Sequence, residues 1–536
     1  MLFRSARLLK NWICQPLKRV DDIIARQNSV SELVQKSDVR YSLAESLEKI
    51  YDIQRLATRM SNGSASPKDF IGLKISLSML PRLLEETVDL EYDMFAPIRE
   101  YQEEIADFTQ VIENTIVDNP PILLKEGGII KPNVSGELDY FRDLLTGGEE
   151  WLQKFEEEEK ERTGIKNLKV AYNKVFGYFI EVTKSNLNMV PQSYVRKQTL
   201  TGAERFITDE LKHHEDDVLS ARFKSTELEY KLFTDFREYS KEFVSKIREI
   251  ADCIAKADVL TSLSEIAVEN NYCKPEIDES DDFIVKNGRH AVLEKILPLG
   301  EYVPNDLDLK SKSTNDSTQF MILTGPNMAG KSTYMRQNAL IAILAQIGSW
   351  VPADYVKLGV VDKVFTRVGA SDDLTLGQST FMVEMIETSF ILNTATDRSF
   401  ILLDEIGRGT STYDGVAIAW SVAEYIATKV GARCIFATHY HELNVMTKTY
   451  PQIKNYRITI TENNGEIEFL RKIVQGGASK SYGIQVAKMA GLPSSVVKRS
   501  EELMRKMQKD FSNNLATRKK MVNNEDEVPQ LSLFGM

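Results

Sequence analysis

A glycine-rich segment of the chain has the residue types and the spacing of a phosphate-binding loop. Its members are Gly325, Pro326, Asn327, Met328, Ala329, Gly330, Lys331, Ser332 and Thr333. The backbone N–H groups of such a loop, with the N-terminus of the following helix, can surround a polyphosphate. Lys331 adds a positive charge for the outer phosphates, and the hydroxyl of Ser332 can bind Mg²⁺. The segment therefore predicts a nucleotide site.

The residues on both sides of this loop predict the structure that a phosphate loop requires. The apolar residues 320–323 precede it and predict a buried strand. A helical pattern follows it and continues to about Ile347. A chance glycine-rich turn is the alternative, and the strand–loop–helix context argues against it.

A second pair of reactive side chains, Asp404 and Glu405, follows the apolar residues 400–403. Asp404 can hold Mg²⁺, and Glu405 can orient and deprotonate an attacking water. The pair is a weak signal alone, and its position 73 residues after Lys331 makes it specific. His439 ends another apolar run and can sense the nucleotide, while a purely structural histidine is the alternative. We predict Lys331, Glu405 and His439 as the catalytic residues.

The composition is that of a protein with several ordinary cores. The chain has 536 residues, which suits three or four domains, and 42% of them are hydrophobic. No apolar run approaches the about 18 residues of a membrane span, and the basic N-terminus lacks a signal peptide's apolar core. The four cysteines lie far apart, which suits a reducing cytoplasm. Because the net charge is −11, a nucleic-acid contact needs a local basic patch.

The elements that must position these residues begin with a long helical part. Residues 1–165 are predicted as a helical core and first arm, in which prolines and glycines separate the helices. Helices are predicted over 7–14, 20–34, 81–117, 137–145 and 149–162. The prediction rests on apolar residues at helical spacing or on runs of charged residues.

A small β-containing insert is predicted over residues 166–214. Residues 174–182 are rich in aromatic and β-branched side chains, which predicts a strand. The insert has eight basic and four acidic side chains, a local charge of +4, and so suits contact with a phosphate backbone. A neutral packing module is the alternative. The predicted phosphate contacts are Lys174, Arg196, Lys197 and Arg205.

A returning helix is predicted over residues 215–275, because no glycine or proline interrupts the chain before Pro275. Its apolar stripe, with the helical period of 3.6, consists of Leu228, Leu232, Phe236, Tyr239, Phe243, Ile247, Ile250, Ile254 and Ala257. Strand-like and helical patterns then alternate, which predicts an α/β nucleotide-binding domain over 276–475. Residues 508–536 are predicted as a polar, flexible tail.

Together these segments resemble the MutS family of DNA mismatch-repair ATPases. The strings that carry the resemblance are RLLKNWICQPL, NKVFGYFIEV, YVRKQTLTGAERFITDEL, TGPNMAGKSTYMRQ, ASDDLTLGQSTFMVEM, FILLDEIGRGTSTYDG, ATHYHEL and SYGIQVAKMAGLP. The implied fold class is multidomain α and α/β. A helical lever and core with a DNA-clamp insert precede a P-loop ATPase of the ATP-binding-cassette type and a helix-turn-helix over 476–507.

The resemblance implies a homodimer closed around double-stranded DNA, with ATP and Mg²⁺ at two composite sites. Asn327 would contact phosphate, Tyr302 would stack on adenine, and Ser379 would reach the γ-phosphate of the partner subunit. It also implies a MutL-type repair partner and a cytoplasmic, nucleoid-associated protein without membrane contact. The tail resembles a peptide that binds the replicative sliding clamp, through Gln530, Leu531, Leu533 and Phe534.

The sequence departs from the family pattern in one respect, and two alternative functions remain open. The match begins inside the helical core, without the mismatch-reading and connector domains, so we expect weak discrimination between mismatched and paired DNA. The first alternative is a relative that acts on recombination or branched DNA. The second is a dimerisation protein that binds nucleotide without turnover, against which Lys331, Asp404 and Glu405 argue.

Overall fold

The computed structural model describes residues 3–92, 94–146, 148–173, 177–298, 300–311, 317–326, 329–367, 380–463, 466–477 and 482–506. The chain divides into two compact units, Met1–Ala6 with Tyr41–Asp258 and Arg7–Arg40 with Val259–Met536. Residues 7–40, which the sequence predicts as part of the first helical arm, therefore group with the second unit. Among the described residues, no helix combines the length and the apolar character needed to cross a membrane.

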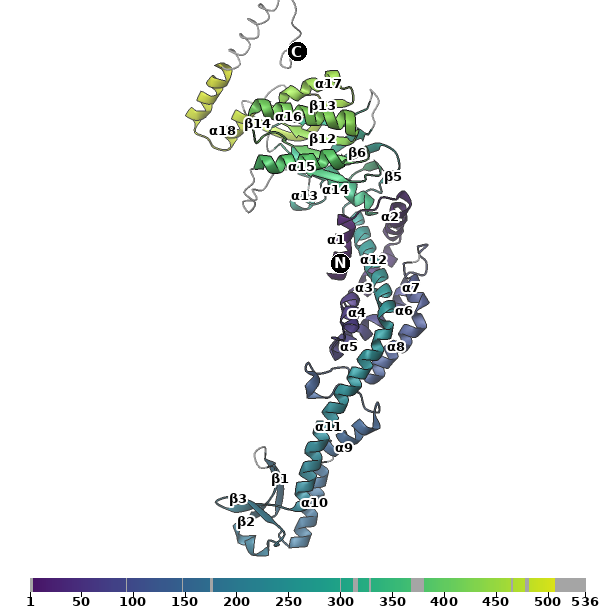
Figure 1. Ribbon diagram of the computed structural model, residues 1–536, viewed down its shortest axis with the longest axis vertical. Helices are drawn as coiled ribbons and strands as arrows, with labels where there is room; N and C mark the ends of the chain where they lie inside the picture. The colour runs from purple at the N-terminus through teal and green to yellow at the C-terminus, as the bar shows by residue number, and fades with distance from the viewer. Residues whose placement is uncertain are drawn as a thin grey trace, which may run out of the picture. The chain divides into compact units, whose positions relative to one another are not determined.

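Helices dominate the chain before the insert (Figure 1). They are α1 (Phe3–Cys14), α2 (Val20–Gln35), α3 (Ser37–Glu48), α4 (Ile53–Ser61), α5 (Pro67–Leu77), α6 (Leu80–Glu86), α7 (Ala96–Glu100), α8 (Gln102–Thr115), η1 (Leu124–Glu126), α9 (Gly136–Thr146) and α10 (Gly148–Thr163). The helical prediction is confirmed except within 81–117. There α6 ends at Glu86, and a loop precedes Ala96.

The insert folds as a small antiparallel sheet in the strand order β1-β2-β4-β3. Its elements are β1 (Lys169–Asn173), β2 (Gly177–Thr183), η2 (Lys184–Met189), β3 (Val195–Thr199) and β4 (Ala203–Ile207). The predicted strand over 174–182 is confirmed from Gly177 onward, and residues 174–176 lie outside the described residues. Ile180, Val182 and Phe206 form the core of the sheet with Phe155 of α10.

A long helical run follows the insert: α11 (Asp209–Ser240), η3 (Lys241–Phe243) and α12 (Val244–Glu269). It starts six residues before the predicted boundary at 215, because the side chain of Thr208 caps α11 by accepting a hydrogen bond from the backbone N of Leu211 at 3.1 Å. The predicted apolar stripe is correct for α12. On α11, Phe236 is buried as predicted, but the other buried positions are shifted by one, since Phe233 is buried and Tyr239 is exposed.

The buried face of α11 also contains a charged residue. Glu229 is buried on the core face of the helix, where apolar counting cannot find it. Its carboxylate pairs with Arg142 at 2.5 Å and accepts a hydrogen bond from the backbone N of Ile129 at 2.9 Å. A buried carboxylate is stable here because both of its oxygens have partners.

The second unit contains a six-stranded sheet in the order β10-β11-β12-β8-β13-β14. All neighbours are parallel except β14, which is antiparallel to β13. The strands are β8 (Phe320–Thr324), β10 (Val364–Arg367), β11 (Phe400–Asp404), β12 (Arg433–Thr438), β13 (Ile453–Asn463) and β14 (Glu466–Gln475). The strands predicted beside the phosphate loop, before Asp404 and before His439 are therefore confirmed.

A second sheet of this unit has the order β5-β9-β6-β7. Its strands are β5 (Glu276–Asp278), β6 (Asp282–Gly288), β7 (Asn305–Lys310) and β9 (Tyr355–Gly359). The helical elements are α13 (Leu293–Ile296), α14 (Lys331–Gln346), α15 (Thr380–Thr394), α16 (Thr412–Tyr425), η4 (Ile426–Val430), η5 (His441–Val445), α17 (Met446–Thr449) and α18 (Gly483–Met489). Residues 494–506 are also helical.

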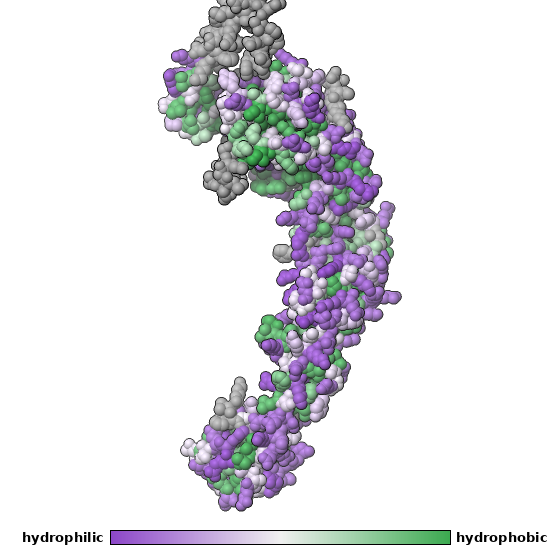
Figure 2. All heavy atoms as spheres, in the orientation of Figure 1, coloured by the Kyte–Doolittle hydropathy of each residue, from purple (hydrophilic) through white to green (hydrophobic). Residues whose placement is uncertain are grey.

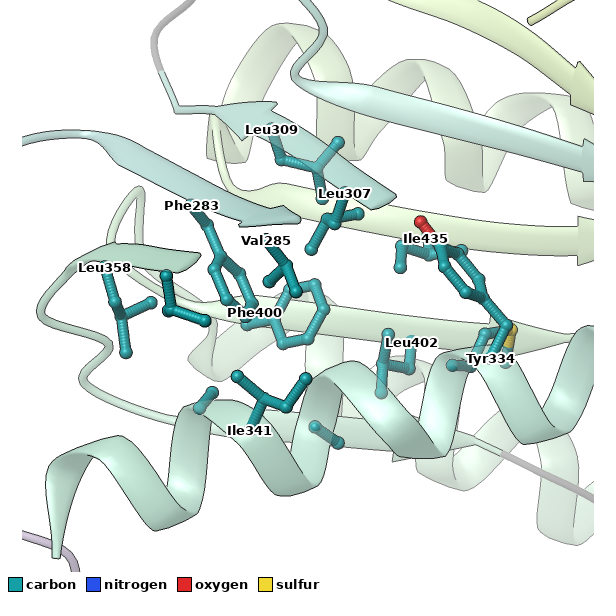
Figure 3. Packing of buried hydrophobic residues seen from close by; sticks show 14 of the residues in the cluster. Phe283, Val285, Leu307, Leu309, Tyr334, Ile341, Leu358, Phe400, Leu402 and Ile435 are labelled. Carbon is teal, nitrogen blue, oxygen red and sulfur yellow. The ribbon is translucent and has the colours of Figure 1, made fainter. Parts of the chain in front are cut away.

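The core of the second unit explains why β8, β11 and most of β12 are apolar. Leu402 and Ile435 face α14 and the second sheet, where Ile341 and Phe283 meet them (Figure 3). Alternate residues such as Leu403 face the opposite cluster with α16. Since both faces are covered, these central strands are hydrophobic at successive positions, as expected for parallel strands.

Candidate functional site

The predicted phosphate loop lies between β8 and α14, and both of its ends are described. Gly330 precedes α14 with a φ of +107°, a backbone region that favours glycine. Ala329 and Thr333 lie on the described side of the loop, whereas Asn327 and Met328 lie outside the described residues. Ser379, predicted to reach a partner subunit, also lies outside them.

The ammonium group of Lys331 is held inside this loop. Its Nζ donates hydrogen bonds to the carbonyl oxygens of Gly325, at 2.6 Å, and Pro326, at 3.2 Å. Burial lowers the pKa of Lys331 from its ordinary value, and the negative charges of Glu405 and Asp404 oppose that shift. A buried cation that binds two carbonyl oxygens is suited to an anionic ligand.

Ser332 and Asp404, the two predicted Mg²⁺ ligands, lie together. The Oγ of Ser332 donates a hydrogen bond to Oδ2 of Asp404 at 2.6 Å. Sheet register explains this contact, because Asp404 is aligned with Ala437 of β12 and through it with Leu323 of β8. Ligands commonly bind at this carboxyl edge of parallel strands.

The residues present fit a magnesium ion. Burial raises the pKa of the Asp404 carboxyl, against the hydrogen bond from Ser332, so a nearby cation would stabilise its charged form. Within the described ranges, no group of three or more histidine, cysteine or acidic side chains could hold a metal. Mg²⁺ commonly needs only one or two protein ligands beside water and phosphate oxygens.

Glu405 lies beside Asp404 with both carboxylate oxygens paired. His439 Nε2 is 2.5 Å from Oε1, and Arg408 pairs with Oε2. The hydrogen bond with His439, strengthened by Arg408, lowers the pKa of Glu405 to about 2. Its φ of +57° is unusual for a residue with a side chain, which is a frequent sign of a functional position.

A cavity of about 570 Å³ lies beside Glu405, His439 and the first two residues of the phosphate loop. Its lining consists of Gly325, Pro326, Glu405, Arg408, Thr438, His439, Tyr440, His441, Tyr482, Gly483 and Val486. Arg408 and Tyr440 were not predicted as site residues from the sequence. The only signals for them were the glycine spacing around Arg408 and the position of Tyr440 directly after His439.

Tyr302 borders a separate cavity of about 260 Å³, whose lining also includes Gly330 and Thr333. The hydroxyl of Tyr302 donates a hydrogen bond to Oε1 of the buried Gln337 at 2.8 Å. Burial raises the pKa of Tyr302 to about 12. An aromatic ring next to the phosphate loop suits a flat base attached to a polyphosphate. Gln337 carried no signal in the sequence.

The basic side chains predicted on the insert are largely paired within the insert. Arg196 lies 2.7 Å from Glu204, Lys197 lies 3.8 Å from Glu215, and Arg205 lies 3.0 Å from Glu181. Arg205 also covers the ring of Phe179 at 4.1 Å. Lys174 lies outside the described residues, as do the tail residues Gln530, Leu531, Leu533 and Phe534.

The ionic pairs leave these cations unequally accessible. The side chain of Arg196 is 61% exposed, that of Lys197 31% and that of Arg205 19%. The visible face of the small sheet, at the foot of Figure 2, is mainly hydrophilic. Arg196 is therefore the most available of the three described cations for a ligand.

Comparison with known proteins adds independent information. A family model described as MutS domain V matches residues 321–508, and one described as MutS domain III matches residues 5–264. The DNA mismatch repair protein MutS of Clostridium botulinum strain Hall is 47% identical over 513 residues, or 95% of this chain and 55% of that protein. The protein of the same name from Acetivibrio thermocellus is 48% identical over 508 residues, or 95% of this chain and 58% of that protein.

The fold and the matches define a mixed helical and α/β protein, with a long helical core and a unit built on sheets. The two family models together cover most of the chain. The chain belongs to the MutS family. It spans somewhat more than half the length of the curated relatives it matches.

Proposed function

We propose that this chain hydrolyses ATP with Mg²⁺ and couples hydrolysis to the binding of double-stranded DNA in mismatch repair. The observation that supports this most is one edge of the parallel sheet. There Lys331 and Ser332, at the start of α14, meet Asp404, Glu405 and His439, at the ends of β11 and β12. Shifted pKa values of a lysine and two neighbouring acids, here Lys331, Asp404 and Glu405, beside a phosphate loop suit phosphoryl transfer.

In this proposal Lys331 binds the outer phosphates in place of the loop carbonyls, and Tyr302 stacks on the adenine. Mg²⁺ held by Ser332 and Asp404 would neutralise charge on the phosphates. Because its pKa is about 2, Glu405 is ionised at neutral pH and is a weak proton acceptor. Its main contribution is therefore to orient the attacking water, once one oxygen leaves Arg408 or His439.

The wider role is supported by the family and by the names of the relatives, which are DNA mismatch repair proteins. The helical segments 483–489 and 494–506 would form the helix-turn-helix that joins two copies into a homodimer. We include in the proposal a MutL-type partner, a tail contact with the sliding clamp and a cytoplasmic, nucleoid-associated location. The small sheet would contact the DNA backbone without sequence preference.

The test is ATP hydrolysis by the full chain with and without Mg²⁺ and duplex DNA. The Lys331→Met variant should lose nucleotide binding and hydrolysis. Lys429→Met changes an exposed lysine away from the cavity and should hydrolyse ATP like the unchanged chain. Equal hydrolysis by the Lys331→Met variant would contradict the proposed site.

A further inference from the structure

The loop that follows Glu405 is held by contacts that the proposed mechanism does not use. The backbone N–H of Gly407 donates a hydrogen bond to Oε1 of Glu384 at 2.5 Å. The carbonyl oxygen of the same glycine accepts one from the hydroxyl of Tyr440 at 2.9 Å. Glu384 is only 6% exposed, so its carboxylate has few alternatives to these protein partners. The two peptide groups that flank the Cα of Gly407, two residues after Glu405, are therefore each held by a side chain.

Close packing adds to this hold and explains two glycines of the loop. Gly407 has a φ of +88°, and a Cβ there would lie 2.5 Å from the carbonyl oxygen of Gly415 on α16. A Cβ on Gly409 would lie 2.9 Å from the Cβ of Phe381 on α15. The loop thus contacts α15 and α16 at distances that only glycine allows, so its backbone position depends on those helices.

Glu384 is itself anchored to the sheet that carries the site. Its second oxygen, Oε2, lies 3.6 Å from the guanidinium of Arg367, the last residue of β10. Arg367 also pairs with Glu387 at 3.0 Å and is aligned in register with Leu403 of β11. A charge-assisted network therefore connects α15, β10 and the loop beyond β11.

The backbone of Glu405 needs such support. Its φ of +57° is unfavourable for a residue with a Cβ and persists only where neighbouring contacts enforce it. On one side, the N–H of Glu405 donates a hydrogen bond to the carbonyl oxygen of Ala437 at 2.9 Å. On the other side, the nearest fixed peptide is that of Gly407. Release of Gly407 would let Glu405 relax and rotate its carboxylate away from His439.

We propose that Glu384 is a positioning residue for ATP hydrolysis. By holding the N–H of Gly407, it keeps the backbone of Glu405 in the conformation that directs the carboxylate into the cavity. This inference rests on the proposed function, because it assigns to Glu405 the orientation of water. Glu384 is not among the described residues that line the two cavities, so nucleotide affinity should depend on it little.

Three substitutions of Glu384 in the full chain separate the hydrogen bond from the charge. Glu384→Gln retains an oxygen that can accept from Gly407, and its kcat should stay within about threefold of the unchanged chain. Glu384→Leu removes the acceptor, and Glu384→Asp withdraws it while keeping a charge near Arg367. In both we expect kcat to fall at least about tenfold, because small misplacements of catalytic groups cost up to about a hundredfold. The Kd for ATP should change less than about threefold.

The matched control is Glu387→Gln, on the same helix and paired with the same arginine but without contact to Gly407. Its kcat should remain within about twofold of the unchanged chain. Rates are normalised to the fraction of chains that bind ATP, so a variant that is merely less folded does not mimic the effect. If folded Glu384→Leu and Glu384→Asp variants keep the original kcat, the inference is wrong.

Hydrogen exchange of the loop provides a readout independent of hydrolysis. The Gly407 amide should exchange at least about tenfold faster in Glu384→Asp than in Glu384→Gln or the unchanged chain, and equal exchange would overturn the inference. If the unchanged chain does not hydrolyse ATP, the proposed function fails, and this measurement still decides whether Glu384 holds the loop.

Discussion

Charged side chains are arranged in opposite ways at the nucleotide cavity and on the small sheet of the insert. At the cavity, burial raises the pKa of Asp404 and lowers the pKa of Lys331, so desolvation outweighs the attraction between their opposite charges. On the insert, Arg196 and Arg205 each have an acidic neighbour within 3.0 Å. The first arrangement is stabilised by adding an anion and a cation, whereas the second is already neutralised.

The difference teaches that a count of charges does not locate a binding surface. The insert has a net charge of +4, yet its three described predicted contacts are in ion pairs. Exposed pairs of this kind contribute at most about 1 kcal/mol, so DNA phosphates can compete for the more accessible cations. Accessibility, in which Arg196 exceeds Arg205, should therefore decide which arginine binds DNA.

The largest expected effect concerns the cavity. Glu405→Gln should lower kcat for ATP at least about tenfold, because a neutral amide orients the attacking water less well than a carboxylate and small misplacements of reacting groups cost up to about a hundredfold, while the Kd for ATP is retained. The measurements are steady-state hydrolysis and equilibrium nucleotide binding. Glu279→Gln, an exposed substitution away from the cavity, is the control. An unchanged kcat would remove Glu405 from the reaction and abolish the contrast between the two regions.

A smaller effect is expected at the edge of the same site. Tyr302→Ala should raise the KM for ATP about tenfold, because stacking of a base on an aromatic ring is worth about 1–3 kcal/mol. Tyr302→Phe keeps the ring, loses the hydrogen bond to Gln337 and should raise KM only about threefold. Tyr425→Ala, on the surface of α16, serves as control. Equal KM values for the alanine and phenylalanine variants would argue against stacking.

On the insert, two arginines provide a matched pair. Arg196→Gln should reduce the slope of log K against log salt for duplex DNA by about one unit, as expected for one lost phosphate contact. Arg205→Gln should leave that slope unchanged and lower the midpoint of thermal unfolding, because Arg205 packs on Phe179. Binding titrations over a salt series measure the first effect. The reverse order of slopes would show that exposure does not select the contact.

The smallest effect concerns another internally paired acid of the first unit. Hydrogen bonds from Lys131 and Lys74 lower the pKa of Glu113 to about 2, from an ordinary value of 4.5. Its contribution to the free energy of unfolding is therefore present above about pH 4.5 and is lost as the pH falls toward 2. Glu113→Gln should destabilise the unit slightly at pH 7 in urea unfolding, and less at pH 3. A difference that grows in acid would contradict this assignment.

The sequence predicted the elements of the nucleotide site well because local rules govern them. A glycine spacing, an apolar run and the residues after it predicted β8, α14, β11 and β12. Period alone failed on α11, where the buried face includes Glu229 and excludes Tyr239. The buried face contains a carboxylate whose partners are distant in the sequence, and no count of apolar residues can detect such a group.

By itself, the sequence determined the family, the order of strands and helices around the phosphate loop, and the types of reactive residues. Only the tertiary structure decided which charges are available. Gln337 of α14 accepts a hydrogen bond from Tyr302, and Glu384 of α15 accepts one from Gly407. The physical reason is that burial and pairing depend on neighbours brought together by sheet register and helix packing. The spacing of residues along the chain predicts interactions between residues that are close in sequence. It does not predict the partners that folding brings from elsewhere in the chain.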